Sequence, residues 1–248
     1  MRSPGAGAHR FSMKAELTGS DWWQHGKDLF LTTSLTESPL APDYDRSAMI
    51  TGIVHIGVGG FHRAHEAVYL DRLMRRRAGA GPRDGAEPIK PGGSCLEWGI
   101  CGVGLLPGDA RMRDALESQG HLYTLIRKHP GGLRDPVVIG SIHDYRLAPD
   151  DPEAVLALMS RPTTRIVSLT ITEGGYNVDD VTGEFRTFSP GAVHDATHPG
   201  EPTTAFGYIV EALRRRRADG TPPFTVMSCD NLPGNGKVAC TAAVSQAA

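Results

Sequence analysis

The feature that most limits how this chain can fold is an apolar run that passes through a glycine turn directly into a helix pattern. The segment reads GIVHIGVGGFHRAHEAVYLDRLMRRR over residues 52–77. Its first part is rich in β-branched residues, as in a buried strand. The apolar positions after the glycines then recur at helical spacing, at Ala64, Ala67, Val68, Leu70 and Leu73. A strand, a tight turn and a helix in direct succession predict an α/β fold.

The same alternation continues along the chain. Further strands are predicted at residues 98–103, 137–142 and 165–172 and from Phe224, with helices at residues 151–159 and 204–217 and a last helix ending at Ala243. Asp151 is predicted to cap the first of these helices, with Pro152 at its first position. We therefore predict a doubly wound, mostly parallel sheet with helices on both faces.

Two segments depart from this alternation. Residues 1–50 show no clear period and contain Pro39 and Pro42, so we expect an N-terminal extension there. Residues 78–93 are rich in glycine and proline and are expected to form a surface insertion. Residues 51–248 then form one domain.

Composition limits the classes of function. Lys and Arg total 26 against 28 for Asp and Glu, a net charge of −2, which gives no general field for gripping nucleic acid. The longest apolar runs fall far short of the roughly 18 residues of a membrane helix, and the N-terminus lacks the apolar core of a signal peptide. We expect a cytoplasmic protein that binds neither nucleic acid nor membranes.

A metal site is not expected. The four cysteines contain no C-x-x-C pair, so their spacing matches neither a zinc site nor a disulfide framework. His62 and His65 form an H-x-x-H pair on one helical face, but no third ligand lies near them in the sequence. Packing and hydrogen bonding at the helix start are the expected roles of both rings.

The glycine turn is the first candidate site. Gly57 and Gly59 form a G-x-G at the end of the predicted strand, where missing side chains let a pyrophosphate approach the amides at a helix start. His62 stands in place of the third glycine of the usual G-x-G-x-x-G. The motif alone therefore leaves two readings open: a dinucleotide-binding turn, and a tight turn that binds nothing.

Asp109 is a candidate for the adenosine end of such a ligand. A carboxylate near the end of the second strand can accept hydrogen bonds from the ribose hydroxyls and repel a 2′-phosphate. Asp109 follows the loop Val103-Gly104-Leu105-Leu106-Pro107-Gly108, which could fold back over the nucleotide. The alternative is an ordinary exposed aspartate in a turn.

Two polar motifs follow two other predicted strands. Thr172-Glu173-Gly174-Gly175-Tyr176 ends one strand, and Ser228-Cys229-Asp230-Asn231-Leu232-Pro233-Gly234-Asn235-Gly236 ends another. Ligands of open parallel sheets bind at the carboxyl ends of the strands. Each motif combines carboxylate or amide groups with glycines that allow close approach. Their alternative roles are helix capping by Asp230 or Asn231 and a solvated Glu173.

The strings GIVHIGVGGFHRAH, WGICGVGLLPGD, IVSLTITEGGY and FTVMSCDNLPGNG resemble the polyol-specific long-chain dehydrogenase/reductase family, also called the mannitol dehydrogenase family. Its members include mannitol 2-dehydrogenases, arabinitol dehydrogenases, and fructuronate and tagaturonate reductases, and the chain most resembles the first group. The resemblance implies a Rossmann domain that binds NAD, a small polyol or ketose as substrate, and no zinc.

The resemblance also implies roles for particular residues. It places Asp109 at the adenosine ribose, Asn231 beside the reacting oxygen as one amide of an oxyanion-stabilising pair, and Glu173 in the relay that moves the proton to solvent. Around the NAD pyrophosphate it places Ile56, Gly57, Val58, Gly59, Gly60, Phe61, His62 and Arg63.

One departure from the family concerns the base. The resemblance implies a second, mostly helical domain with a catalytic lysine in a K-x-x-x-x-N-x-x-H pattern, and this sequence ends at Ala248 before any such pattern. Lys237 is the only lysine after Lys128, and no Asn or His follows it at the required spacing. We expect a truncated chain without the C-terminal helical domain.

Three functions therefore remain open. The first is an NAD-dependent oxidoreductase that interconverts D-mannitol and D-fructose by hydride transfer. The second is a sugar-acid reductase acting on fructuronate or tagaturonate, and the third is a catalytically inactive NAD-binding fragment. The DNA beyond the codon for Ala248 would separate the enzymes from the fragment, because a continuation encoding the lysine pattern favours an enzyme.

Overall fold

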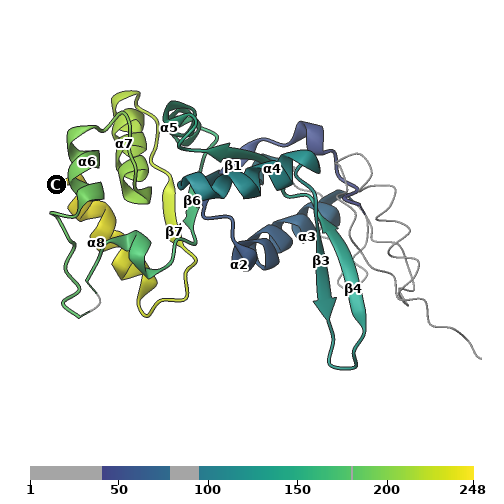
Figure 1. Ribbon diagram of the computed structural model, residues 1–248. Helices are drawn as coiled ribbons and strands as arrows, with labels where there is room; N and C mark the ends of the chain where they lie inside the picture. The colour runs from purple at the N-terminus through teal and green to yellow at the C-terminus, as the bar shows by residue number, and fades with distance from the viewer. Residues whose placement is uncertain (1–40, 79–94, 180) are drawn as a thin grey trace, which may run out of the picture. The chain divides into compact units, whose positions relative to one another are not determined.

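The computed structural model describes residues 41–78, 95–179 and 181–248, all within one compact unit (Figure 1). Its centre is a parallel sheet in the order β5-β2-β1-β6-β7. The strands are β1 (Thr51–Ile56), β2 (Gly99–Gly104), β5 (Ile142–Leu147), β6 (Ile166–Leu169) and β7 (Thr225–Ser228). The predicted doubly wound, parallel sheet is confirmed.

The order of the strands reverses next to β1. The chain first builds β2 and β5 on one side of β1, and then crosses over to add β6 and β7 on the other side. In an open α/β sheet, such a reversal leaves a crevice at the carboxyl ends of the two central strands. The crevice here therefore lies where β1 and β6 end.

Helices cover both faces of the sheet. Successive side chains of each strand point to opposite faces, so they pack into two separate cores. Val54 and Ile56 belong to one core together with residues of α5, α7 and α8, whereas Ile53 belongs to the other together with α3 and α4. The helices are α2 (Gly60–Ala64), α3 (Glu66–Ala78), α4 (Ala110–Ser118), α5 (Pro152–Ser160), α6 (Pro190–Thr197), α7 (Ala205–Ala218) and α8 (Asn235–Ala247).

Two predicted helix starts are confirmed by their caps. Asp151 accepts a hydrogen bond from the Ala154 amide at 2.9 Å at the start of α5, and Thr204 accepts one from the Gly207 amide at 3.0 Å at the start of α7. Two helices differ from expectation. The helix after the glycine turn is interrupted at His65, and the last helix continues past Ala243 to Ala247.

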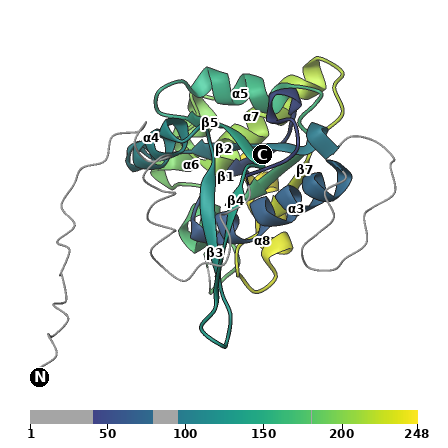
Figure 2. The ribbon, with the colours of Figure 1, turned by 90° about the vertical axis from the view of Figure 1, so that its right-hand side faces the viewer.

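The strand predicted at residues 137–142 is wrong. Its first part belongs to β4 (Arg134–Ile139), which pairs antiparallel with β3 (Tyr123–Lys128), and its last residue begins β5. Gly140 separates the two strands, and its amide donates to the buried Asp71 carboxylate at 2.9 Å. The hairpin β3–β4 projects from the sheet in both views (Figures 1 and 2). The strand predicted at residues 165–172 is also shorter, because β6 ends at Leu169.

Part of the sequence assigned to the N-terminal extension packs on this domain. The Tyr44 hydroxyl donates to the Asp71 carboxylate at 2.6 Å, and the Arg46 side chain donates to the Gly140 carbonyl at 3.0 Å. The insertion expected at residues 78–93 lies outside the described residues except for Ala78, which ends α3. Among the described residues, no helix combines the length and apolar character needed to cross a membrane.

Candidate functional site

The glycine turn lies in the crevice between β1 and β6. Gly57 has φ of +91°, and a Cβ placed on it would lie 2.1 Å from the carbonyl oxygen of Thr170, just after β6. Its own amide donates to the Val103 carbonyl of β2 at 3.0 Å. Only glycine meets both the backbone angle and this close approach. The turn is therefore fixed against the ends of both strands that neighbour β1.

The next two glycines are open to a ligand. Gly59 and Gly60 are exposed, and a Cβ on Gly60 would have no neighbour within 4 Å. They lead into the first amides of α2, where an anion is favoured by the unpaired N–H groups. The Arg63 side chain returns to this turn, because its Nε donates to the Gly59 carbonyl at 3.3 Å. A backbone without side chains and a nearby cation suit a phosphate group.

The other residues predicted for this site divide between core and surface. Ile56 and Val58 are buried, one in each of the two cores, so they fix the turn to the domain and do not face a ligand. His62 is also buried, whereas Phe61 is 53% exposed at the rim. Only the glycines, Phe61 and Arg63 of the predicted set thus present surface to a ligand in the described structure.

Asp109 lies beside the end of β2. A Cβ on Gly104, the last residue of that strand, would fall 2.5 Å from the Asp109 Cβ, so the loop between them folds back on the strand. One oxygen of the half-buried carboxylate accepts a hydrogen bond from the Leu106 amide at 2.9 Å. Asp109 is therefore held at the same sheet edge as the glycine turn, one strand away.

The two polar motifs meet at the ends of neighbouring strands. Glu173 begins a short 3-10 turn after β6, and Asn231 lies in the loop after β7; both residues are exposed. Between them, the Asp230 carboxylate accepts hydrogen bonds from the amides of Ile171 at 2.9 Å and Thr172 at 3.1 Å. The structure thus brings together the two loops that the sequence could only place at one edge.

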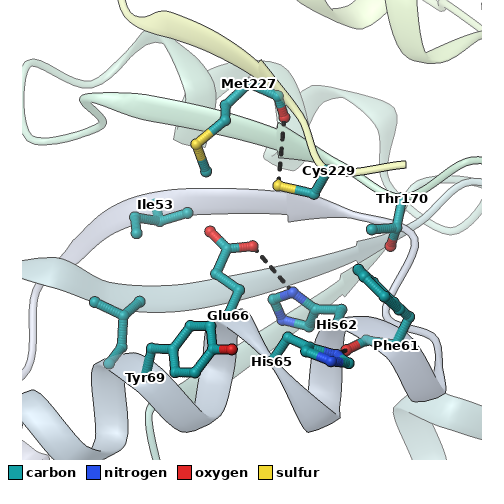
Figure 3. A pocket seen from close by; sticks show the side chains of 10 residues that line it. Ile53, Phe61, His62, His65, Glu66, Tyr69, Thr170, Met227 and Cys229 are labelled. Atoms are coloured by element: carbon teal, nitrogen blue, oxygen red, sulfur yellow. Dashed lines mark hydrogen bonds and ion pairs between the residues drawn. The ribbon is translucent and has the colours of Figure 1, made fainter. Parts of the chain in front are cut away.

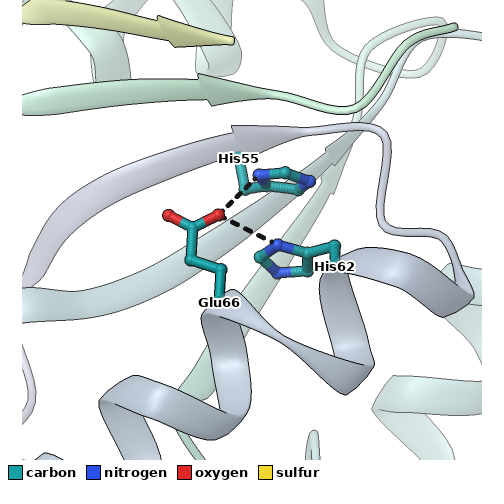
Figure 4. A group of neighbouring side chains, drawn as sticks. All are labelled: His55, His62 and Glu66. Atoms are coloured by element: carbon teal, nitrogen blue, oxygen red, sulfur yellow. Dashed lines mark hydrogen bonds and ion pairs between the residues drawn. The ribbon is translucent and has the colours of Figure 1, made fainter. Parts of the chain in front are cut away.

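Sequence reasoning missed a buried polar cluster beneath the glycine turn (Figure 4). The Glu66 carboxylate lies 3.1 Å from Nδ1 of both His55 and His62, and it accepts a hydrogen bond from the Ser168 hydroxyl at 3.1 Å. The two imidazole rings stack with centroids 3.4 Å apart. The spacing of His62 and Glu66, one turn apart on a helix, was the available signal.

This cluster carries a negative charge that is largely, though not fully, buried, because the Glu66 side chain is 15% exposed. Burial alone raises the pKa of Glu66, but hydrogen bonds from His55 and His62 outweigh it and hold that pKa at about 2. Burial lowers the pKa of His62 to about 4 despite its bond to Glu66. The carboxylate therefore stays ionised and the His62 ring stays neutral at physiological pH.

The same three side chains have the composition of a metal site. Ligand atoms of His55, His62 and Glu66 all lie within 4.8 Å of one another. Both Nδ1 atoms lie 3.1 Å from the same carboxylate oxygen, however, so each can donate a hydrogen bond to it, and a metal would have to replace those protons. His65, the other member of the predicted H-x-x-H pair, is exposed and bonds the Phe61 carbonyl instead.

A pocket adjoins this cluster (Figure 3). Met227 and Cys229 of the β7 end face side chains of α2 and α3, among them the exposed Phe61 and Tyr69. Burial raises the pKa of the Cys229 thiol to about 11, so that side chain is a neutral, apolar part of the wall. The pocket opens next to the crevice and presents mostly apolar surface.

The sequence matches one family of known proteins. The family described as the mannitol dehydrogenase Rossmann domain matches residues 51–248. A mannitol 2-dehydrogenase of Cereibacter sphaeroides is 49% identical over 213 residues, which are 86% of this chain and 41% of the relative. A mannitol 2-dehydrogenase of Pyricularia oryzae is 48% identical over 199 residues, 79% of this chain and 36% of the relative.

Solved structures give the same result. The ternary complex of Pseudomonas fluorescens mannitol 2-dehydrogenase with NAD and D-mannitol matches with a TM-score of 0.76 at 46% identity, over 88% of this chain and 41% of that chain. A substrate-free D-sorbitol dehydrogenase matches with a TM-score of 0.74 at 42% identity, over 88% of this chain and 42% of that chain. The chain thus spans about two fifths of the length of the proteins it matches.

Proposed function

The chain belongs to the mannitol dehydrogenase family, and from that premise we propose that it is the NAD-binding part of an oxidoreductase that interconverts D-mannitol and D-fructose by hydride transfer. The observation that carries the proposal is the open glycine turn at the reversal of strand order, with polar loops beside it. Asp109 lies on one side of the turn, and Glu173 and Asn231 lie on the other. A dinucleotide laid across the turn would have its adenosine near Asp109 and its nicotinamide near β6 and β7.

In this proposal the turn residues bind the cofactor. Its pyrophosphate would approach the Gly59 and Gly60 backbone, with Arg63 as the nearby cation, while Gly57 and the buried Ile56, Val58 and His62 hold the turn in shape. Phe61 would lie at the rim towards the pocket. When bound, NAD supplies the acceptor for the hydride.

The proposed chemical roles fall on the two exposed polar side chains. Asn231 would donate a hydrogen bond to the alkoxide that develops as hydride leaves the alcohol carbon. An amide cannot accept the hydroxyl proton, so this step needs a separate base. Glu173, a carboxylate at the open edge, would pass that proton towards solvent. The resemblance assigns the base to a lysine of a further domain.

The other functions that the sequence left open find no support in the comparisons. The relatives described above are named for mannitol and sorbitol, so a polyol is favoured over a sugar acid as the substrate. The cytoplasmic location, and the expectation that the protein binds no metal and no nucleic acid, stay predictions.

Turnover tests the proposal directly. A version of the protein extended by the lysine-bearing domain of a relative should reduce NAD in the presence of D-mannitol, followed by NADH absorbance. Asn231→Ala in that version should lower kcat by roughly 10²-fold or more, because it removes a donor to the developing alkoxide. Activity on fructuronate with none on mannitol or fructose would overturn the substrate assignment.

A further inference from the structure

One residue of the site has a backbone conformation that is rare without glycine. Thr172 has φ of +61° and ψ of 170°, in a region that β-branched residues avoid. It directly precedes Glu173, the proposed proton-relay residue. A strained conformation of this kind persists only where neighbouring groups hold it in place.

The group that holds Thr172 is the Asp230 carboxylate. One of its oxygens accepts the Thr172 amide at 3.1 Å, and the other accepts the Ile171 amide at 2.9 Å and the Tyr176 hydroxyl at 2.7 Å. Of these three donors, the Ile171 amide precedes the strained residue, the Thr172 amide belongs to it, and the Tyr176 hydroxyl follows it. Asp230 therefore fixes both ends of the turn that carries Glu173.

The groups around Asp230 are themselves held in place. The Tyr176 ring is 1% exposed and packs against Phe206, and its hydroxyl also lies 2.6 Å from the Ser228 hydroxyl. The Asn235 side chain donates to the carbonyl of Asp230 at 3.1 Å. The loop after β7 is thus tied to α8, and the loop after β6 is tied to the loop after β7.

We propose that Asp230 is a positioning residue of the dehydrogenase site, which sets Glu173 relative to Asn231 by holding Thr172 in its strained conformation. Asp230 precedes Asn231 in the chain and bonds the backbone that precedes Glu173, so one carboxylate locates both side chains. Its oxygens already accept three hydrogen bonds within the protein, so it acts through the loop rather than on the substrate. This inference rests on the proposed function for the roles of Glu173 and Asn231.

The first test needs no activity. Asp230→Asn replaces one acceptor oxygen by an NH₂ group that faces hydrogen-bond donors, so the loop should loosen. Amide hydrogen exchange at Ile171 and Thr172 should accelerate at least tenfold in the 248-residue chain. Asp179→Asn is the matched control. The Asp179 carboxylate also accepts hydrogen bonds from two loop amides, those of Val181 and Thr182, but it lies in an exposed turn that comes after the site in the chain. Unchanged exchange at Thr172 in Asp230→Asn would overturn the inference.

The second test separates positioning from cofactor binding. In the extended protein, Asp230→Asn should lower kcat for mannitol oxidation at least tenfold and change the NAD dissociation constant less than threefold, whereas Asp179→Asn should change neither. Asp230→Glu, which keeps the charge, should recover part of kcat. A folded Asp230→Asn protein with wild-type kcat would overturn the positioning role, and an inactive wild-type protein would instead contradict the proposed function.

Tyr176→Phe covers the case in which Asp230→Asn does not fold. It keeps the buried ring and removes one of the three hydrogen bonds, so it should give a smaller change in the same direction, with exchange at Thr172 faster than wild type. Wild-type exchange and wild-type kcat in Tyr176→Phe, together with a misfolded Asp230→Asn, would show that Asp230 serves stability alone and would overturn the proposal.

Discussion

Asp109 is the residue at which the choice between two related cofactors can be tested. Its carboxylate lies at the end of β2, where it would bond the free ribose hydroxyls of NAD and repel the 2′-phosphate of NADP. Asp109→Ala should weaken NAD binding by roughly tenfold or more, the effect of losing a charged hydrogen bond, and should narrow the preference for NAD over NADP. Calorimetric titration of both cofactors measures this. Equal affinity for the two cofactors in wild type and variant would mean that Asp109 has been misassigned.

His62 should make the stability of the domain depend on pH. Burial lowers its pKa from 6.5 to about 4, so below pH 6.5 the unfolded chain binds a proton that the folded chain does not. The contribution of His62 to the free energy of unfolding is therefore fully present above pH 6.5. It is lost as the pH falls towards 4, by about 3 kcal/mol at most. Urea unfolding at several pH values measures the loss.

His62→Gln should make the curve less steep in this window. The remaining slope comes from His121 and His143, whose pKa values burial also lowers, and the further loss below pH 4.5 comes from Glu66, whose pKa is lowered from 4.5 to about 2. His129→Gln, on the exposed hairpin, is the control for the replacement of a histidine by glutamine. A wild-type slope between pH 6.5 and pH 4 in His62→Gln would assign the effect to another group.

Among the helices, Asp195 joins α6 to α7. Its carboxylate is 4% exposed and accepts hydrogen bonds from the amide and hydroxyl of both Thr203 and Thr204 at the start of α7. Asp195→Ala removes the acceptor of these four donors, of which those of Thr204 are half-buried and those of Thr203 are exposed, and should lower the free energy of unfolding by on the order of 2 kcal/mol. Asp179→Ala, at an exposed turn, should cost less than about 1 kcal/mol. Equal losses in chemical denaturation would contradict this account.

The sequence predicted those elements whose signals are local. The strand into Gly57, the Asp151 cap and the helix that begins after Thr204 all follow from residues a few positions apart. The hairpin β3–β4 was missed because the apolar run around Gly140 reads as one strand, and its division depends on the distant Asp71. The contacts of Asp230 with Thr172 and of His55 with Ser168 were also missed, because they join residues 58 and 113 positions apart.

At the scale of the whole molecule, cofactor binding and turnover should separate. The 248-residue chain carries the glycine turn, Glu173 and Asn231 but no residue to which we assign the role of the base. It should bind NAD and give little or no NADH with excess mannitol, because a positioned base commonly contributes roughly 10² to 10⁴-fold. Turnover by this chain near the rate of the extended protein would show that Glu173 or another residue here accepts the proton.

The open backbone of the glycine turn should receive the cofactor, and a titration of NAD into a variant of this turn tests that expectation. Gly59 has φ of −89° and free space around its Cβ position, so Gly59→Val should fold normally while its side chain occupies the path of the pyrophosphate. Gly131→Val, at the hairpin tip where a Cβ would meet nothing within 4 Å, is the matched control. Calorimetric titration with NAD should show binding by the wild type and by Gly131→Val, and at least a tenfold loss of affinity in Gly59→Val. Equal NAD affinity in all three proteins, or none in the wild type, would contradict the account.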